Sequence, residues 1–295
     1  MLVTFRWKKR KSFVQSFDPR AWVIFFVCFI GCTVLFWDVR YLLPFFLIAL
    51  YTVLRSGISW KEMSRAWIFL GGFILFFSFL TFLTGRGGIE LYQVEHVIAR
   101  FEAGFNILGW RPTLLISAER IAYAFSMLVR VFSLASMTVL IPYSLDPSLY
   151  GVTFRGLGLP DKISYGMDLT MRFIPTFARD FSLTMDAQKA RGYEIEKIKG
   201  GFIQQVRKLA PLLIPVTIKA LAGSEDIIDA MDLRAFGIGP RTWLIQLNYS
   251  KRDYALIIFG VLLFTGCLAL SLQGFGKFWT PQFLLDLAKF ALPIK

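Results

Sequence analysis

Two arginines occupy matched positions in this sequence. Residues 186–193 read Asp-Ala-Gln-Lys-Ala-Arg-Gly-Tyr, and residues 229–236 read Asp-Ala-Met-Asp-Leu-Arg-Ala-Phe. Both copies follow the pattern Asp-Ala-x-x-x-Arg-x-aromatic. A guanidinium stays charged at all ordinary pH and presents a rigid fork of donors that fits a carboxylate with two parallel hydrogen bonds. Arg191 and Arg234 are therefore candidates for a pair of docking points.

The simplest interpretation of these arginines is purely structural. Each copy ends a helix-like stretch that a glycine closes, Gly192 in the first and Gly237 in the second. A basic side chain at a helix C-terminus is favoured by the helix dipole. The repetition of the whole octet favours docking instead. Small residues beside each arginine favour it further, because they leave room for a partner backbone. These small neighbours are Ala190, Gly192 and Ala235.

Composition places the chain in the membrane class. Hydrophobic residues make up 56% of the sequence, phenylalanine alone supplies 31 residues, and only 18% of residues are charged. The mean hydropathy of +0.56 exceeds that of soluble domains. The formal charge of +13 comes from basic residues that flank apolar runs. This pattern is typical of cytoplasmic loops of membrane proteins and does not indicate a nucleic-acid-binding face.

Apolar runs predict the membrane segments. The second run contains Pro44, so the first two are expected to form a tight or partly re-entrant hairpin. Arg130 is the one charge expected at membrane depth, either in a buried ion pair or in a functional position. The predicted segments are residues 21–37, 41–54, 66–83, 112–141 and 254–273.

The middle of the chain has a different character. Residues 142–253 contain 15 of the 33 Lys and Arg and 12 of the 20 Asp and Glu. Charged and apolar residues alternate there at helical spacing, which predicts long amphipathic helices under the cytoplasmic face, with an ordinary transmembrane pair as the alternative. One helix resumes near Asp161 and bends at Pro175. A second begins near Phe202, is interrupted at Pro211 and Pro215, and continues to Ala235.

These patterns predict an all-α polytopic membrane protein, a helical bundle of about five to eight membrane segments with a cytoplasmic coupling domain. The expected domains are residues 1–141, a transmembrane bundle; 142–242, the coupling domain; and 243–295, a last membrane helix and tail. The basic residues before the first span resemble no cleavable signal peptide and are expected to hold the N-terminus in the cytoplasm.

Several kinds of chemistry have no residues to support them. His96 is the only histidine, so no histidine-based catalytic or metal cluster is expected. Three cysteines lie inside apolar runs and are interpreted as small apolar fillers: Cys28, Cys32 and Cys267. The sequence contains no Gly-x-x-x-x-Gly-Lys-Ser/Thr phosphate loop, since the segment 85–88 (Gly-Arg-Gly-Gly) lacks both the lysine and the spacing.

Taken together, a series of motifs resembles the transmembrane T component of energy-coupling factor (ECF) transporters, including relatives in cobalt, nickel and biotin uptake. The series covers most of the chain from residue 18 to 242. Its members are Asp18-Pro-Arg20, Gly156-Leu-Gly-Leu-Pro160, Arg172-Phe-Ile-Pro175, Ala187-Gln-Lys-Ala-Arg-Gly192, Ala230-Met-Asp-Leu-Arg-Ala-Phe-Gly237 and Arg241-Thr242.

The resemblance implies a coupling role and no enzyme activity. In that family, two arginine motifs dock into two cytoplasmic ABC ATPase subunits, which bind the ATP, and a small membrane subunit binds a vitamin or transition-metal ion. The first motif matches fully as Ala190-Arg191-Gly192. The second reads Leu233-Arg234-Ala235, and its bulkier leucine is expected to alter the fit. Pro175, Pro211 and Pro215 become candidate hinges or fixed kinks.

The same resemblance implies a multi-pass protein of a prokaryotic cell membrane that needs no cofactor of its own. Two rival functions stay open at this point. One is a membrane-embedded enzyme acting on an anionic lipid or phosphate substrate, with the arginines binding substrate. The other is a stand-alone secondary transporter, for which internally repeated spans are typical.

Overall fold

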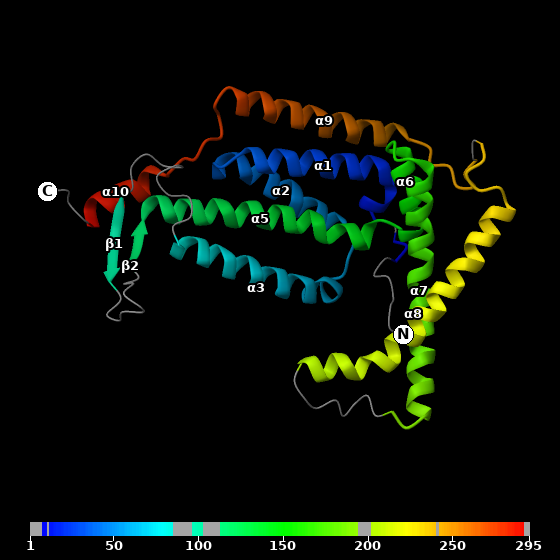
Figure 1. Cartoon of the computed structure of the whole chain (residues 1–295). Helices are drawn as coiled ribbons and strands as arrows, with labels where there is room; N and C mark the ends of the chain where they lie inside the picture. Colours follow the sequence, from blue (N-terminus) through cyan, green and yellow to red (C-terminus); the bar gives the residue numbers. More distant parts are fainter. Residues whose placement is uncertain are drawn as a thin grey trace. The chain divides into compact units, whose positions relative to one another are not determined.

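The computed structural model describes residues 8–10, 12–84, 96–102, 113–193, 202–239 and 242–291. They form two compact units (Figure 1): one contains Leu145–Asn248, and the other combines Lys8–Ser144 with Tyr249–Lys295. Some features singled out in the sequence lie outside the described residues. These are the segment 85–88, the part of the basic arm before Lys8, and Arg241.

In the part of the larger unit that the structure describes, five long helices lie side by side as a bundle (Figure 1). Helix α1 packs mainly along α9, whereas α2 and α3 pack along α5. The first two helices thus have different main partners, which the predicted hairpin did not anticipate. The bundle helices are α1 (Pro19–Leu35), α2 (Val39–Arg55), α3 (Trp60–Thr84), α5 (Ala118–Ser144) and α9 (Lys251–Leu272), and a short 3-10 turn η1 (Val14–Ser16) precedes them.

Within the described part of the chain, three helices are long and apolar enough to cross a membrane: Trp60–Phe82, Ala118–Ser144 and Lys251–Leu272. Helix α1 is also apolar but shorter, and α2 has 17 residues with Pro44 inside it. Large hydrophobic side chains such as Phe69 and Leu262 are exposed on the bundle surface. This arrangement is that of an all-α polytopic membrane protein.

Small residues allow α1 and α9 to approach closely. A Cβ atom added to Gly31 would lie 2.5 Å from the Phe264 ring, and one added to Gly260 would lie 3.3 Å from Phe25. At the other end of the contact, the buried Asp253 carboxylate accepts the backbone N–H of Asp18 at 2.8 Å. Close packing along the two helices and a buried hydrogen bond at their starts therefore hold α1 against α9.

A β-hairpin replaces the beginning of the helix that was expected over residues 112–141. Strand β1 (Val97–Glu102) pairs antiparallel with β2 (Thr113–Ser117), and α5 begins only at Ala118. The buried Glu119 carboxylate accepts from the backbone N–H of His96 at 2.9 Å and contacts its Nδ1 at 2.7 Å. A short apolar run does not distinguish strand from helix, so these long-range contacts decide the boundary. The last helix, α10 (Gln282–Ala291), packs against β1.

Arg130 is buried in the bundle without the acidic partner that one interpretation of the sequence expected. Its Nη2 donates to the backbone carbonyl of Phe36, and its guanidinium carbon lies 4.1 Å from the centre of the Trp37 ring. No carboxylate forms an ion pair with it among the residues that the structure describes. Arg130 therefore fastens α5 to the α1–α2 connection through a carbonyl and an aromatic face.

The smaller unit is built around two long helices. A 3-10 turn η2 (Pro147–Leu149) and helix α6 (Tyr150–Gly156) lead to α7 (Asp161–Ala190), which is followed by α8 (Phe202–Leu233). Helix α6 lies close to α7, since a Cβ atom on Gly151 would lie 2.6 Å from the carbonyl oxygen of Ser164. The interruption predicted at Pro211 and Pro215 is wrong: both prolines lie inside one continuous helix, and Figure 1 shows that this helix is bent.

Candidate docking site

The first arginine ends α7 in a Schellman cap. Arg191 is the C-cap residue, and Gly192 adopts a φ of 81°, in the left-handed region that favours glycine. The Gly192 N–H donates to Lys189 O at 2.9 Å, and the Tyr193 N–H donates to Gln188 O at 3.0 Å. Arg191 is exposed, as are both of its neighbours in the motif.

The second arginine ends α8 with the same hydrogen bonds. Arg234 follows the last helical residue, Ala235 N–H donates to Asp232 O at 2.9 Å, and Phe236 N–H donates to Met231 O at 3.0 Å. Ala235 adopts a φ of 53° and is the one non-glycine residue with a left-handed backbone in the described part of the chain. The sequence pointed to Gly237 as the closing residue, but the cap is made two residues earlier. The helix therefore ends at Leu233, before the Ala235 that was expected to end it.

The two helices run antiparallel, so their C-terminal caps lie far apart. Lys219 Nζ lies 2.5 Å from Asp180 Oδ1, and the rings of Tyr165 and Phe236 have their centres 4.6 Å apart. The α8 cap is thus beside the start of α7, whereas Arg191 lies at its far end. At about 1.5 Å per residue, about 40 Å of helix separates the two caps.

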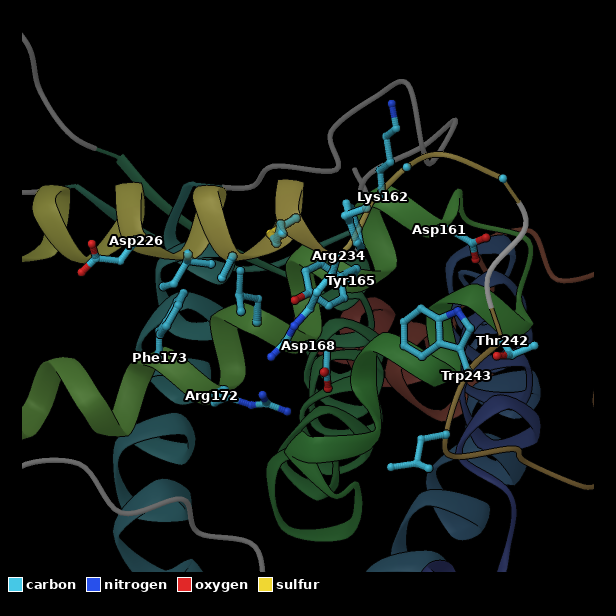
Figure 2. Close-up of a pocket in the computed structure, with 18 residues that line it drawn as sticks. Asp161, Lys162, Tyr165, Asp168, Arg172, Phe173, Asp226, Arg234, Thr242 and Trp243 are labelled. Atoms are coloured by element: carbon cyan, nitrogen blue, oxygen red, sulfur yellow. The ribbon is translucent and has the colours of Figure 1, made fainter.

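A cavity of about 690 Å³ lies beside the second cap. One face of α7 contributes Asp168 and Arg172, and the α8 end contributes Arg234 (Figure 2). These side chains project into the same space in Figure 2. The remaining lining residues are Asp161, Lys162, Tyr165, Leu169, Phe173, Asp226, Ile227, Ala230, Met231, Phe236, Gly237, Gly239, Thr242, Trp243 and Leu244.

Local contacts hold the cavity walls in place. The Arg155 Nε donates to Asp161 Oδ1 at 2.6 Å, and the guanidinium carbon of Arg155 lies 5.4 Å from the centre of the Trp243 ring. The Tyr165–Phe236 ring contact fixes the opposite corner. Two aromatic contacts and an ion pair therefore shape the recess next to Arg234.

Sequence reasoning named both arginines as candidates but missed the cavity. Arg172 belongs to a quoted motif, yet no role followed from the motif. A usable signal was present in the spacing of Asp161, Tyr165, Asp168 and Arg172, which places all four on one helical face. That face becomes a site only because α8 returns beside it, and the sequence pattern does not contain the pairing of the two helices.

The candidate hinges lie within the helix shafts. Pro175 is inside α7, and Pro211 and Pro215 are inside α8. Two contacts cross between the helices near these positions: the Lys219–Asp180 ion pair, and a hydrogen bond of 3.4 Å from Gln188 Nε2 to Pro211 O. Each proline removes one backbone donor from its helix; both helices are continuous, and α8 is visibly bent (Figure 1).

Comparison with known proteins relates the chain to transporter components. Residues 10–242 match the family CbiQ, described as cobalt transport protein. Three curated relatives share the name energy-coupling factor transporter transmembrane protein EcfT. The Lactococcus lactis protein is 28% identical over 258 residues, covering 84% of this chain and 89% of the relative. The Exiguobacterium sibiricum protein is 30% identical over 210 residues, covering 68% of this chain and 73% of the relative. The Thermosediminibacter oceani protein is 29% identical over 260 residues, covering 86% of this chain and 92% of the relative.

Proposed function

The chain belongs to the CbiQ family of cobalt transport proteins, and from that premise we propose that it is the energy-coupling transmembrane subunit of an ECF-type importer. In this proposal it transmits ATP-driven motion from two cytoplasmic ABC ATPase subunits to a small membrane subunit that binds the substrate. The substrate is a vitamin or a transition-metal ion. The chain acts as a non-enzymatic part of the complex, in a prokaryotic cell membrane.

The observation that carries this proposal is the pair of geometrically similar caps at distant helix ends. Each cap presents an arginine directly after the last helical turn, and about 40 Å of helix separates them. One small ligand does not reach across that distance, whereas two separate protein subunits do. The arrangement thus favours two partners over a single substrate held by both arginines.

The surroundings of each arginine suit a protein contact. Around Arg191, Ala190 and Gly192 are small and exposed, so a partner backbone has room to approach. Beside Arg234, Leu233 is 89% exposed. A leucine so exposed next to a charged residue suits burial in a partner groove, so we propose that it adds apolar contact area to the second docking point.

The helices supply a mechanical route in this proposal. ATP is bound by the partners, since this sequence has no phosphate loop. Movement of the two ATPases displaces the ends of α7 and α8, and the cross-links between the shafts transmit the displacement along both helices. Pro175, Pro211 and Pro215 are the points at which the shafts bend most easily.

We propose that the N-terminus lies on the cytoplasmic side. Lys8 and Arg10 both pair with Glu62 near the start of α3, close to the basic residues Lys61 and Arg65. Basic residues at the ends of apolar helices mark the cytoplasmic face. The cytoplasmic α2–α3 connection and the N-terminal arm are therefore on one side of the membrane.

The test is co-expression of the chain with its two ATPases and its substrate-binding subunit. Arg191→Ala and Arg234→Ala are expected to leave membrane insertion intact and to weaken ATPase association by about tenfold or more, since each strands a carboxylate of the partner. Substrate uptake falls in parallel, and the double variant is the most severe. Arg179→Ala, which removes an exposed arginine elsewhere on α7, is the matched control. Normal ATPase co-purification and uptake in both single variants would contradict the proposal.

A further inference from the structure

We propose that the cavity beside Arg234 receives an acidic side chain of a partner protein and that Arg172 and Arg234 bind its carboxylate together. The inference rests on the proposed function, because it takes the partner to be the ATPase that docks at the second cap. It adds a second arginine, from a different helix, to that docking point. It also gives the Arg234 docking point a defined recess next to the arginine.

The geometry brings the two guanidinium groups to one space. Arg172 comes from the first half of α7 and Arg234 from the end of α8, and both line the same cavity of about 690 Å³. Figure 2 shows both side chains projecting into it from the two helices. Two guanidinium forks around one recess are suited to a carboxylate, which accepts hydrogen bonds on both oxygens.

The charge of the cavity also favours an anionic group. Of its three acidic side chains, Asp161 is already paired with Arg155 at 2.6 Å. When Arg155 is counted with the lining residues, four basic groups (Arg155, Lys162, Arg172 and Arg234) stand against three acidic ones (Asp161, Asp168 and Asp226). The recess therefore carries an excess of positive charge, so an acidic partner residue improves the balance and a basic one worsens it.

The apolar lining indicates a protein segment as the occupant. Aromatic rings form much of the wall: Tyr165, Phe173, Phe236 and Trp243. A volume of about 690 Å³ exceeds what one carboxylate side chain fills and accommodates a short stretch of chain. An acidic residue flanked by apolar residues matches both the charge and the walls.

Asp168 has a defined part in this site. It lines the cavity on the same face of α7 as Arg172, one helical turn away. In the free chain its carboxylate occupies the neighbourhood of the two guanidinium groups, so it competes with an incoming carboxylate. Its removal is expected to strengthen docking, which is the opposite of what a loss of structure produces.

The experiment measures binding of the purified ATPase subunits to the chain, held in lipid nanodiscs with its substrate-binding subunit. Arg172→Gln is expected to weaken binding about tenfold, Arg172→Lys less, and Asp168→Asn to tighten binding. Arg172→Gln combined with Arg234→Ala weakens binding by less than the product of the single effects, because both act on one carboxylate. Arg172→Gln combined with Arg191→Ala weakens binding by the full product of the two single effects. Arg179→Gln, an exposed α7 arginine outside the cavity, binds like the unmodified chain.

The outcomes separate this inference from the proposed function. If Arg172→Gln and Asp168→Asn both bind like the unmodified chain while Arg234→Ala binds weakly, the two-arginine site is overturned and the coupling role stands. If Arg191→Ala and Arg234→Ala both bind normally, the coupling role itself is overturned. A folding defect in Arg172→Gln leaves Asp168→Asn decisive, since tighter binding supports the site and unchanged or weaker binding contradicts it.

Discussion

Ala235 occupies, at the end of α8, the backbone position that Gly192 occupies at the end of α7. Both are the first residue after the arginine C-cap, both have a left-handed φ, and both donate to the carbonyl three residues earlier at 2.9 Å. The two caps are therefore geometrically alike although only one contains glycine. The alanine retains this geometry at a conformational cost that glycine does not incur.

That cost predicts a stabilising substitution. Ala235→Gly is expected to stabilise the α8 cap by up to about 1 kcal/mol, because the strain of a Cβ atom in the left-handed region exceeds the extra entropy of an unfolded glycine. Gly192→Ala is the matched change and is expected to destabilise the α7 cap. Amide hydrogen exchange at Phe236 and Tyr193 measures each effect separately. Faster exchange at Phe236 in Ala235→Gly would contradict the strain argument.

Arg130 is expected to stabilise the bundle. Arg130→Leu removes the donor to the Phe36 carbonyl and the contact with the Trp37 ring, so the free energy of unfolding should fall by about 2–4 kcal/mol. Arg130→Lys retains a hydrogen-bond donor, so its free energy of unfolding should fall by less. Unfolding in detergent by increasing SDS measures the change, with Arg65→Leu on the exposed side of α3 as control. A transition unchanged by Arg130→Leu would show that the carbonyl and ring contacts contribute nothing.

Asp253 is expected to be the most sensitive residue at the start of α9. Its carboxylate accepts the Asp18 N–H at 2.8 Å and both the N–H and the hydroxyl of Ser250 at 2.7 Å, and the residue is 2% exposed. Asp253→Ala leaves these donors unsatisfied, for an expected loss of about 2–4 kcal/mol. Asp253→Asn keeps the shape of the side chain, so its stability should lie between those of the unmodified protein and Asp253→Ala. The check is thermal unfolding in detergent, where equal midpoints for all three proteins would refute the expectation.

The close contact of α1 with α9 predicts that a larger side chain at position 31 destabilises the protein. Gly31→Ala places a Cβ atom 2.5 Å from the Phe264 ring, so we expect overpacking to cost about 1–3 kcal/mol. Phe264→Leu in the same chain should restore much of the loss, because it removes the clashing ring. Gly71→Ala in α3 is the control, since no atom lies within 4 Å of its added Cβ. Additive effects of the two substitutions in unfolding experiments would disprove direct contact.

The sequence predicted features that depend on neighbouring residues. Apolar runs marked α3 and α9, the charge change marked the region of α7 and α8, and the octets marked both helix ends. The start of α7 at Asp161 and of α8 at Phe202 agree with the expectation. Helix formation depends on hydrogen bonds over four residues, so local patterns contain most of this information.

Features that depend on distant partners were not predictable in this way. The hairpin before α5 depends on Glu119 binding His96, and the partners of Arg130 come from a connection far away in the chain. The α8 cap was expected at Gly237, whereas the structure makes it at Ala235, in a left-handed φ that alanine seldom adopts. In each case a local preference was overridden by contacts made elsewhere.

By itself, the sequence determined that this is a helical membrane protein with two arginine-bearing helix ends, because hydropathy and helix periodicity are properties of short segments. Only the tertiary structure decided that these ends lie about 40 Å apart and that Arg172 shares a cavity with Arg234. The physical reason is that both facts follow from the antiparallel packing of α7 and α8. That packing depends on side chains from two helices meeting at once, which no pattern along one helix specifies.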